Sequence, residues 1–328
     1  MERQIVVHYE HPPDLESIRF LRARLLPQLC LTTAEDGPAP KDTNVLVAGR
    51  PTRALLEEIK SIRAVIVPWS GIPPETRQLV AGFSGITLHN LHHNAAPVAE
   101  LALALLLAVA KIVVPLDRSM REHDWTARYL PSTAVLLEGK TALIVGYGAI
   151  GQRVASFCNH LGMDVLAIRR NLDSKNNADG VIIHPPEALH TLLPSTKALM
   201  ICLPHTHETD GLIGQTELDL LPADAMLVNI GRGAVVDEAA LYAALRDGRI
   251  HGAGLDVWYN YPTDEASRSN TPPANFPFHE LDNVVMSPHR GGDSADTDRL
   301  RMMHLADLLN NVVEGKPMPN LVDLSAGY

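Results

Sequence analysis

TALIVGYGAIG, residues 141–151, is the stretch that decides the fold of this chain. Its first half is a short apolar run, typical of a buried parallel strand, and a helix is expected to begin at about Ile150. Between them lies a Gly-x-Gly-x-x-Gly loop. Gly146 would permit the tight turn, Gly148 would let the backbone approach a pyrophosphate, and Gly151 would let the helix lie close to the strand. A strand, this loop and a helix in that order predict a dinucleotide-binding unit.

Similar apolar runs recur on both sides of this unit, with helical spacing between them, as in TRALLEEIK at 52–60. The runs are 4–9, 44–49 and 64–69 before it, and 164–169, 198–204, 225–231, 252–258 and 283–288 after it. Strands that alternate with helices predict an α/β fold with parallel, doubly wound sheets. At 328 residues the chain can form two such Rossmann-like domains, with a cleft between them. We expect residues 1–96 and 295–328 to form one domain, because the last helix returns to it, and residues 97–294 to form the other.

Two further motifs bring in chemically active side chains. NIGRG at 229–233 places Arg232 directly after an apolar run that is typical of a strand. SPHRGG at 287–292 places His289 in a turn rich in proline and glycine. A dinucleotide site, an arginine and a histidine are what hydride transfer to a 2-keto acid requires. The cofactor would supply the hydride, the guanidinium would bind the carboxylate, and the imidazole would deliver the proton, because its pKa lies near the working pH.

Composition excludes several classes of protein. A hydrophobic content of 46% is typical of a soluble globular protein, and a formal net charge of −10 argues against binding to nucleic acid or to anionic membranes. The three cysteines (Cys30, Cys158 and Cys202) have no metal-like spacing and do not form a disulfide framework. The first eight residues show no signal-peptide pattern. We therefore expect a cytoplasmic protein without a bound metal.

One stretch, residues 98–116, is almost long and apolar enough to span a bilayer. It contains Glu100 and Lys111, whose charges are costly in lipid, and it ends near Pro115. We interpret it as one long helix, buried in a domain core or in a dimer interface.

The strand expected at 164–169 ends in Arg169, Arg170 and Asn171. In dinucleotide-binding folds a carboxylate at this position would bind the adenosine ribose and exclude a 2′-phosphate. Two guanidinium groups would instead bind a 2′-phosphate, so the sequence favours NADP over NAD. The alternative is that both arginines only solvate a loop.

Taken together, these segments resemble the D-isomer-specific 2-hydroxyacid dehydrogenase family over nearly the whole chain. The segments that carry the resemblance are 94–111, REHDW at 121–125, 161–170, 201–214, 227–241, GAGLDVW at 252–258, 287–292 and 320–328. The resemblance implies an NAD(P)-dependent oxidoreductase that transfers a hydride between NAD(P)H and a 2-keto acid or D-2-hydroxy acid, in the direction of reduction with NADPH. It also implies a homodimer, with 1–96 and 295–328 as the substrate domain and 97–294 as the dinucleotide-binding domain.

The resemblance also implies roles for individual residues. Arg232 would hold the substrate carboxylate and polarise the 2-oxo group, and His289 would be the general acid in reduction. Asp256 would bind the nicotinamide carboxamide, and the backbone N–H groups of Ser70 and Gly71 would bind the carboxylate. The implied cofactor-binding residues are Gly146, Gly148, Ala149, Ile150, Gly151, Arg169, Arg170, Leu203, Pro204, Ile230, Gly231, Asp256 and Gly291. The resemblance implies Ser70 and Gly71 as substrate-binding residues, and Trp69, directly before them, is our third candidate for substrate binding.

The chain departs from the family at Tyr261, where the family normally has a glutamate that pairs with the histidine and raises its pKa. Tyr261 is therefore our third candidate catalytic residue, orienting His289 through its hydroxyl group as a neutral partner. Alternatively, Asp264 or Glu265 is the partner of the histidine. Without the family glutamate, His289 is predicted to titrate lower than usual, and reduction is predicted to fade earlier as the pH rises.

The substrate loop is the second departure, because VPWSGIPP at 67–74 replaces the Gly-x-Gly-x-Asp pattern that is more frequent in the family. Trp69, Tyr259 and Tyr261 would form an aromatic mouth, which favours a substrate larger than glyoxylate. His92 and His93 are expected to be hinge or cleft residues rather than metal ligands, because neither a carboxylate nor a cysteine lies nearby in the sequence.

Two other functions stay open on the sequence alone. The first is a formate- or phosphite-type dehydrogenase, which Tyr261 supports as a neutral partner of the histidine. The second is a dinucleotide-sensing binding protein, similar to the corepressor branch of the family, in which turnover is incidental. Turnover of a 2-keto acid at ordinary enzyme rates would set the second aside.

Overall fold

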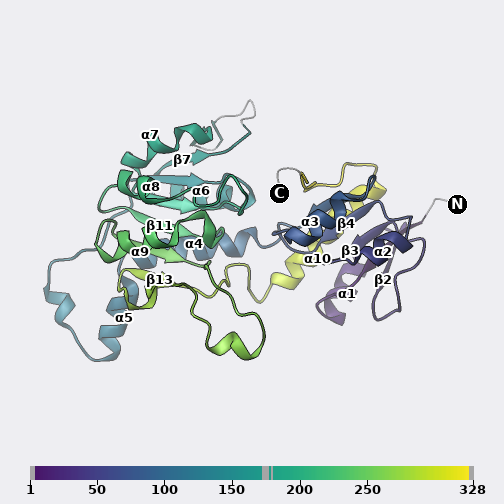
Figure 1. Cartoon of the computed structure of the whole chain (residues 1–328), viewed down its shortest axis with the longest axis horizontal. Coiled ribbons are helices and arrows are strands. Elements are labelled where there is room, and N and C mark those ends of the chain that lie inside the picture. Colours follow the sequence, from purple (N-terminus) through teal and green to yellow (C-terminus); the bar gives the residue numbers. More distant parts are fainter. Residues whose placement is uncertain (1–3, 172–176, 179, 325–328) are drawn as a thin grey trace. The chain divides into compact units, whose positions relative to one another are not determined.

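The computed structural model describes residues 4–171, 177–178 and 180–324. The chain divides into two compact units, Met1–Asn94 with Asp293–Tyr328 (unit 1) and Ala95–Gly292 (unit 2) (Figure 1). Each unit is built on one sheet whose strands alternate with helices along the chain. The fold is therefore α/β with two parallel sheets, as the sequence predicts.

Unit 1 contains a five-stranded parallel sheet in the order β2-β1-β3-β4-β5. Its strands are β1 (Ile5–Tyr9), β2 (Leu29–Thr33), β3 (Val45–Val47), β4 (Ala64–Val67) and β5 (Thr87–Asn90). Its helices are α1 (Leu15–Arg22), α2 (Arg53–Glu58), α3 (Pro74–Ala81) and α10 (Thr297–Val313). The apolar residues of α1 and α10 cover one face of the sheet, and those of α2 and α3 cover the other. The helix at the end of the chain thus completes the core of the unit that begins it.

Unit 2 contains the larger sheet, in the order β13-β12-β11-β10-β6-β7-β9-β8, in which only β8 is antiparallel among the described pairs. Its strands are β6 (Thr141–Val145), β7 (Asp164–Ile168), β8 (Asn177–Ala178), β9 (Val181–His184), β10 (Ala198–Ile201), β11 (Met226–Asn229), β12 (Gly252–Leu255) and β13 (Val284–Met286). Its helices are α4 (Ala95–Ala110), α5 (Val113–Arg121), α6 (Ala149–His160), α7 (Leu189–Leu192), α8 (Gln215–Leu220) and α9 (Glu238–Arg246). Helices α4 and α6 cover one face, and α7, α8 and α9 cover the other.

The single long helix expected over 98–116 is wrong, because the helix breaks after Ala110. In a continuous helix the ring of Pro115 would clash with the carbonyl group of Lys111, and the proline has no N–H to donate. The chain instead turns at Ile112, whose φ of 48° lies in the left-handed region, and α5 begins at Val113. Helix α4 is largely buried, whereas no residue of α5 is.

Within the described residues, no single helix is long and apolar enough to span a membrane. The pair α4 and α5 would satisfy length and composition together, but the two helices are bent by 68° relative to each other. Because α4 packs in the core of unit 2, its apolar composition is explained by burial in the protein.

Candidate functional site

The glycine loop links β6 to α6 in the way that the sequence predicts. Gly146 has a φ of 105°, and a Cβ there would lie 2.8 Å from the backbone of Cys202. A Cβ at Gly151 would lie 2.0 Å from the carbonyl oxygen of Gly146, so the helix can approach the loop only without a side chain. At Gly148 a Cβ would meet nothing within 4 Å, and no side chain caps the helix that begins at Ala149. An exposed glycine backbone before an uncapped helix N-terminus fits a bound pyrophosphate.

The neighbouring strands end at the same edge of the sheet. In register, Val145 pairs with Ile201, and Ile201 pairs with Asn229, so the segments after β10 and β11 lie beside the glycine loop. A Cβ at Gly231 would lie 2.4 Å from the carbonyl oxygen of Leu203. The structure thus brings together the residues expected to hold the cofactor after these strands, namely Leu203, Pro204, Ile230 and Gly231.

Arg169 and Arg170 follow β7 directly beside this loop. The N–H groups of Gly146 and Tyr147 both donate to the carbonyl oxygen of Ile168, the last residue of the strand. The guanidinium of Arg170 lies 3.3 Å from the carboxylate of Glu208, and both side chains are exposed. An exposed ion pair contributes little to stability, so it does not prevent this arginine from binding another anion.

Arg232 lies on a tight turn after β11. The side chain of Asn229 closes the turn, since its oxygen accepts from the N–H of Gly231 and its amide donates to the carbonyl oxygen of Arg232, both at 3.0 Å. A Cβ at Gly233 would lie 2.3 Å from the carbonyl oxygen of Trp258, so this glycine allows the turn to contact the segment after β12. The guanidinium of Arg232 is exposed.

His289 lies on the turn after β13, and the buried carboxylate of Asp256 holds this turn. Oδ1 of Asp256 accepts from the hydroxyl of Ser287 at 2.5 Å and from the N–H of Arg290 at 2.9 Å, while Oδ2 accepts from the N–H of Gly291 at 2.9 Å. His289 has a φ of 59°, which is costly for a residue with a side chain and is maintained by these bonds. Asp256, expected to bind the nicotinamide carboxamide, therefore positions the histidine turn.

Tyr261 contacts His289 through its ring. The two ring centroids are 5.5 Å apart at an interplanar angle of 55°, and the Tyr261 hydroxyl accepts instead from the backbone N–H of Trp258 at 3.1 Å. The expectation that this hydroxyl orients the histidine is therefore not met in this arrangement. Asp264 accepts from the N–H of Ser267, and Glu265 pairs with Arg268 at 2.9 Å, so both carboxylates bind within their own turn.

The surroundings of His289 disfavour its protonated form. Burial lowers the pKa of the imidazole, the positive charge of Arg232 lowers it further, and the carboxylate of Asp256 partly opposes both. A lowered pKa of His289 is also what the missing family glutamate predicts. Burial also raises the pKa of the Tyr261 phenol, so this neighbour is neutral at physiological pH.

The substrate loop expected at Trp69–Gly71 follows β4 in unit 1. The side-chain amide of Asn90 donates to the carbonyl oxygen of Ser70 at 2.7 Å. The backbone N–H of Leu91 donates to the carbonyl oxygen of Trp69 at 3.3 Å. Within the described part of the chain, the N–H groups of Ser70 and Gly71 make no hydrogen bond. Two adjacent N–H groups on a loop held by its carbonyl oxygens fit a carboxylate ligand.

The histidines 92 and 93 follow β5 in unit 1. His93 is buried, and burial together with the charges of Arg301, His304 and His92 lowers its pKa to about 4. Across the described residues, no group of three or more His, Cys, Asp and Glu side chains could hold a metal ion.

Sequence reasoning missed the residues that hold the functional turns, namely Asn90, Asn229 and the positioning role of Asp256. Asn90 and Asn229 are each the last residue of a buried strand. A polar residue at the end of an apolar run is the sequence feature that could have identified them. The role of Asp256 left no local signal, because its partners lie 31 to 35 residues away.

The chain is similar to several known proteins. Residues 103–291 match the family model described as D-isomer specific 2-hydroxyacid dehydrogenase, NAD binding domain. Glyoxylate reductase of Aeropyrum pernix is 38% identical over 231 residues, 69% of this chain and 65% of that protein. Glyoxylate/hydroxypyruvate reductase B of Salmonella paratyphi B is 32% identical over 279 residues, 84% of this chain and 82% of that protein.

Among solved structures, a D-isomer specific 2-hydroxyacid dehydrogenase from Xanthobacter autotrophicus, in complex with NADPH and MES, has a TM-score of 0.79. It is 25% identical in sequence, and the match covers 99% of this chain and 100% of that chain. This chain spans only about half to two thirds of the length of several curated relatives that it matches.

Proposed function

Because the chain belongs to the D-isomer specific 2-hydroxyacid dehydrogenase family, we propose that it reduces a 2-keto acid to a D-2-hydroxy acid with NADPH. The observation that carries the proposal is the pair of adjoining turns after β11 and β13. One turn presents Arg232 and the other presents His289. Trp258 contacts both turns, because its carbonyl oxygen lies 2.3 Å from where a Cβ of Gly233 would be and its indole N–H donates to the carbonyl oxygen of Ser287 at 2.8 Å.

Different residues carry out substrate binding and proton transfer. Arg232 binds the substrate carboxylate and draws electron density from the 2-oxo group, and His289 donates the proton that the 2-oxygen requires. A reduced nicotinamide, when bound, supplies the hydride. The N–H groups of Ser70 and Gly71 provide further donors for the carboxylate.

The cofactor is held by the glycine loop and by the N-terminus of α6, where Gly148 leaves the backbone open to a pyrophosphate and Gly146 and Gly151 allow the close packing of the loop. Arg169 and Arg170 support NADPH over NADH, since two guanidinium groups rather than a carboxylate directly follow the last residue of β7. The solved relative from Xanthobacter, itself in complex with NADPH, supports the same preference.

We further propose that two copies of the chain associate through the exposed apolar segment that begins with α5. Its large exposed side chains are Val113, Val114, Leu116, Met120, Trp125, Tyr129, Leu130 and Leu136. A contiguous apolar segment of this kind marks an interaction surface.

A cytosolic setting is supported by three cysteines without disulfide partners.

The proposed reaction is tested by initial rates of NADPH and NADH oxidation. Each cofactor is combined with glyoxylate, hydroxypyruvate, pyruvate and bulkier 2-keto acids. The expected result is turnover with NADPH on at least one of them. Tight cofactor binding without turnover of any substrate would favour the alternative that the neutral Tyr261 supports, a dinucleotide-sensing protein. The reductase proposal would then be withdrawn.

A further inference from the structure

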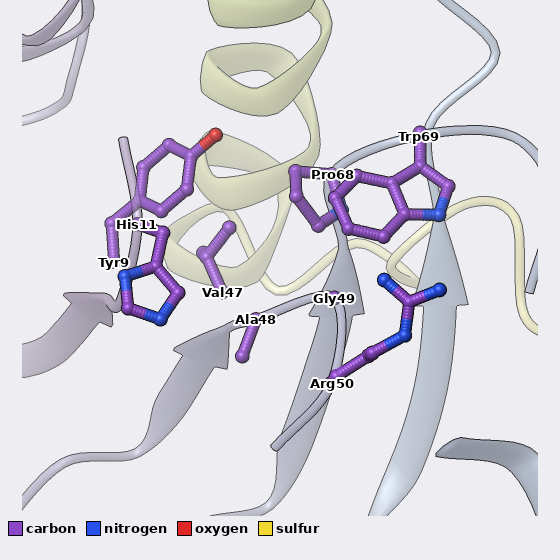
Figure 2. A pocket seen from close by; sticks show the side chains of 8 residues that line it. All are labelled: Tyr9, His11, Val47, Ala48, Gly49, Arg50, Pro68 and Trp69. Carbon is purple, nitrogen blue, oxygen red and sulfur yellow. The ribbon is translucent and has the colours of Figure 1, made fainter. Parts of the chain in front are cut away.

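Unit 1 contains a pocket of about 290 Å³ at the carboxyl edge of its sheet (Figure 2). Three adjacent strands contribute to it at or just after their last residues. The lining residues are Tyr9 and His11 after β1, Val47, Ala48, Gly49 and Arg50 after β3, and Pro68 and Trp69 after β4. The carboxyl edge of a parallel sheet is where ligands bind in open α/β folds.

The pocket and the expected carboxylate-binding loop share a wall. Trp69 lines the pocket and directly precedes Ser70 and Gly71. A Cβ at Gly49 would lie 1.8 Å from the indole of Trp69, so the ring lies flush against this backbone. The buried hydroxyl of Thr76, on α3, donates to the carbonyl oxygen of Gly49 at 2.8 Å. The position of Arg50 relative to the loop is therefore set by short, buried contacts.

Most of the wall is apolar or aromatic. Tyr9 is buried, and burial raises the pKa of its phenol to about 12, so it adds no charge to the pocket. Val47, Ala48 and Pro68 supply aliphatic surface. Such a wall suits a short carbon chain.

Arg50 is the only lining residue with a permanent charge. Its Nε donates to the carboxylate of Glu75 at 2.8 Å, and the two side chains are 68% and 60% exposed. An ion pair this exposed contributes little, so another carboxylate can compete for the guanidinium. Figure 2 shows the two terminal nitrogens of Arg50 on the side of Trp69.

We propose that this pocket receives the end of the substrate remote from the keto group, and that Arg50 binds a terminal carboxylate there. The inference rests on the proposed reduction and names its substrate class as 2-oxo dicarboxylic acids. A guanidinium matches a carboxylate with two parallel hydrogen bonds. A phosphoryl dianion would meet one permanent cation already in contact with Glu75, so the carboxylate is favoured.

The test compares substrates that differ only at the far end. The substrates are 2-oxopentanedioate, its 5-methyl ester, and a 2-oxo acid that ends in a phosphonate, each with NADPH. The quantity measured is the ratio of kcat/KM for the diacid to that for the ester, in the wild type and in Arg50→Gln. Arg53→Gln is the matched control, because Arg53 is equally exposed and pairs with Glu57 but does not line the pocket.

We expect the wild type to prefer the diacid by about tenfold or more, since a hydrogen bond to a charged group has about that effect. Arg50→Gln should abolish the preference through KM of the diacid, whereas Arg53→Gln should keep it. Glu75→Gln should increase the preference, because it removes the competing carboxylate. An equal rate for diacid and ester, or a preference that survives Arg50→Gln, would overturn the proposal. Preference for the phosphonate would overturn the choice of carboxylate.

A binding measurement separates this proposal from the proposed reduction. The rise in melting temperature caused by the diacid and by its ester is measured for the wild type and for Arg50→Gln, with NADPH present. Arg50-dependent stabilisation by the diacid without turnover would support the pocket and refute the reductase. Turnover of monocarboxylic 2-keto acids with no diacid effect would refute the pocket and support the reductase. Neither stabilisation nor turnover would refute both.

Discussion

The side chains around His289 make this histidine a weak base. Its ring lies beside the neutral Tyr261, and the charge of Arg232 acts on it from the neighbouring turn. Asp256, the nearby carboxylate, binds the hydroxyl of Ser287 before the histidine and the N–H groups of Arg290 and Gly291 after it, and so stabilises the position of the histidine turn. A proton donor with a lowered pKa is stronger but is protonated over a narrower pH range.

This balance predicts the pH dependence of reduction. Reduction needs protonated His289, and a lowered pKa means that this form is lost as the pH rises through a value below 6.5. The kcat/KM of the wild type should therefore fall with a midpoint below pH 6.5, which is lower than for a histidine paired with a carboxylate. A profile whose basic limb lies at pH 8 or above would contradict the prediction.

Tyr261→Glu should move the basic limb of the same profile upward by about one pH unit, because a carboxylate beside the ring stabilises the imidazolium. Tyr261→Phe is the control, since it keeps the ring against His289 and removes only the bond to the N–H of Trp258. That variant should move the limb by much less. Equal shifts in both variants would show that the charge is not the cause.

The arginines after β7 carry the third residue-scale prediction. Replacing Arg169 and Arg170 together by alanine should lower kcat/KM for NADPH at least tenfold while that for NADH changes little, because only the 2′-phosphate loses its partners. Replacing Arg53 and Arg246 together by alanine, which removes two exposed arginines paired with Glu57 and Asp247, is the charge-matched control. Equal losses with both cofactors would indicate damage to the fold.

At the scale of the elements, the junction of β6 and α6 combines two requirements in one loop. The helix can lie close to the strand because Gly151 has no side chain. A ligand can approach the backbone because Gly148 has no side chain. The two glycines are therefore separable by experiment, although they belong to one motif.

Gly151→Ala should destabilise the protein by about 1–3 kcal/mol, because its methyl group would overlap the carbonyl oxygen of Gly146. Gly148→Ala should leave the unfolding midpoint nearly unchanged, because its methyl group enters open space, yet it should raise the Kd for NADPH about tenfold or more. Thermal unfolding and cofactor titration of both variants check this. If Gly148→Ala bound NADPH like the wild type, the loop would not hold the pyrophosphate.

At the scale of the whole molecule, each unit carries functional side chains at the carboxyl edge of its own sheet. Unit 1 presents the loop at Trp69 and the pocket around Arg50, and unit 2 presents the glycine loop and the turns of Arg232 and His289. Neither unit holds the complete set of groups that the proposed reaction needs.

The apolar segment from α5 to Leu136 predicts an oligomer. Replacing both Val114 and Met120 by glutamate should shift the protein from dimer to monomer in sedimentation velocity, because a charge cannot be buried unpaired in such an interface. Leu15→Glu, at an exposed leucine of unit 1, is the control and should leave the mass unchanged. A wild type that sediments as a monomer at micromolar concentration would refute the proposed association.

The sequence by itself determined the features that local patterns encode. The glycine spacing after an apolar strand predicted the βα unit at 141–151. Short apolar runs that alternate with helical segments predicted most of the parallel strands. The strands β2 and β5 lie at the edges of their sheet and were missed, because the runs that form them carry polar residues and give a weak signal. Arg232 and His289 are candidate site residues on the sequence alone because each lies in a short motif.

Tertiary structure decided what depends on contacts between distant residues. Only the folded chain brings Asp256 to the backbone around His289, turns the Tyr261 hydroxyl toward Trp258, and places Arg50 in the pocket beside Trp69. It also ends α4 at Ala110 and leaves α5 exposed. No periodic pattern in the sequence shows which residue 30 or more positions away a side chain will contact. Sheet register and turn geometry bring the two residues together only when the chain folds.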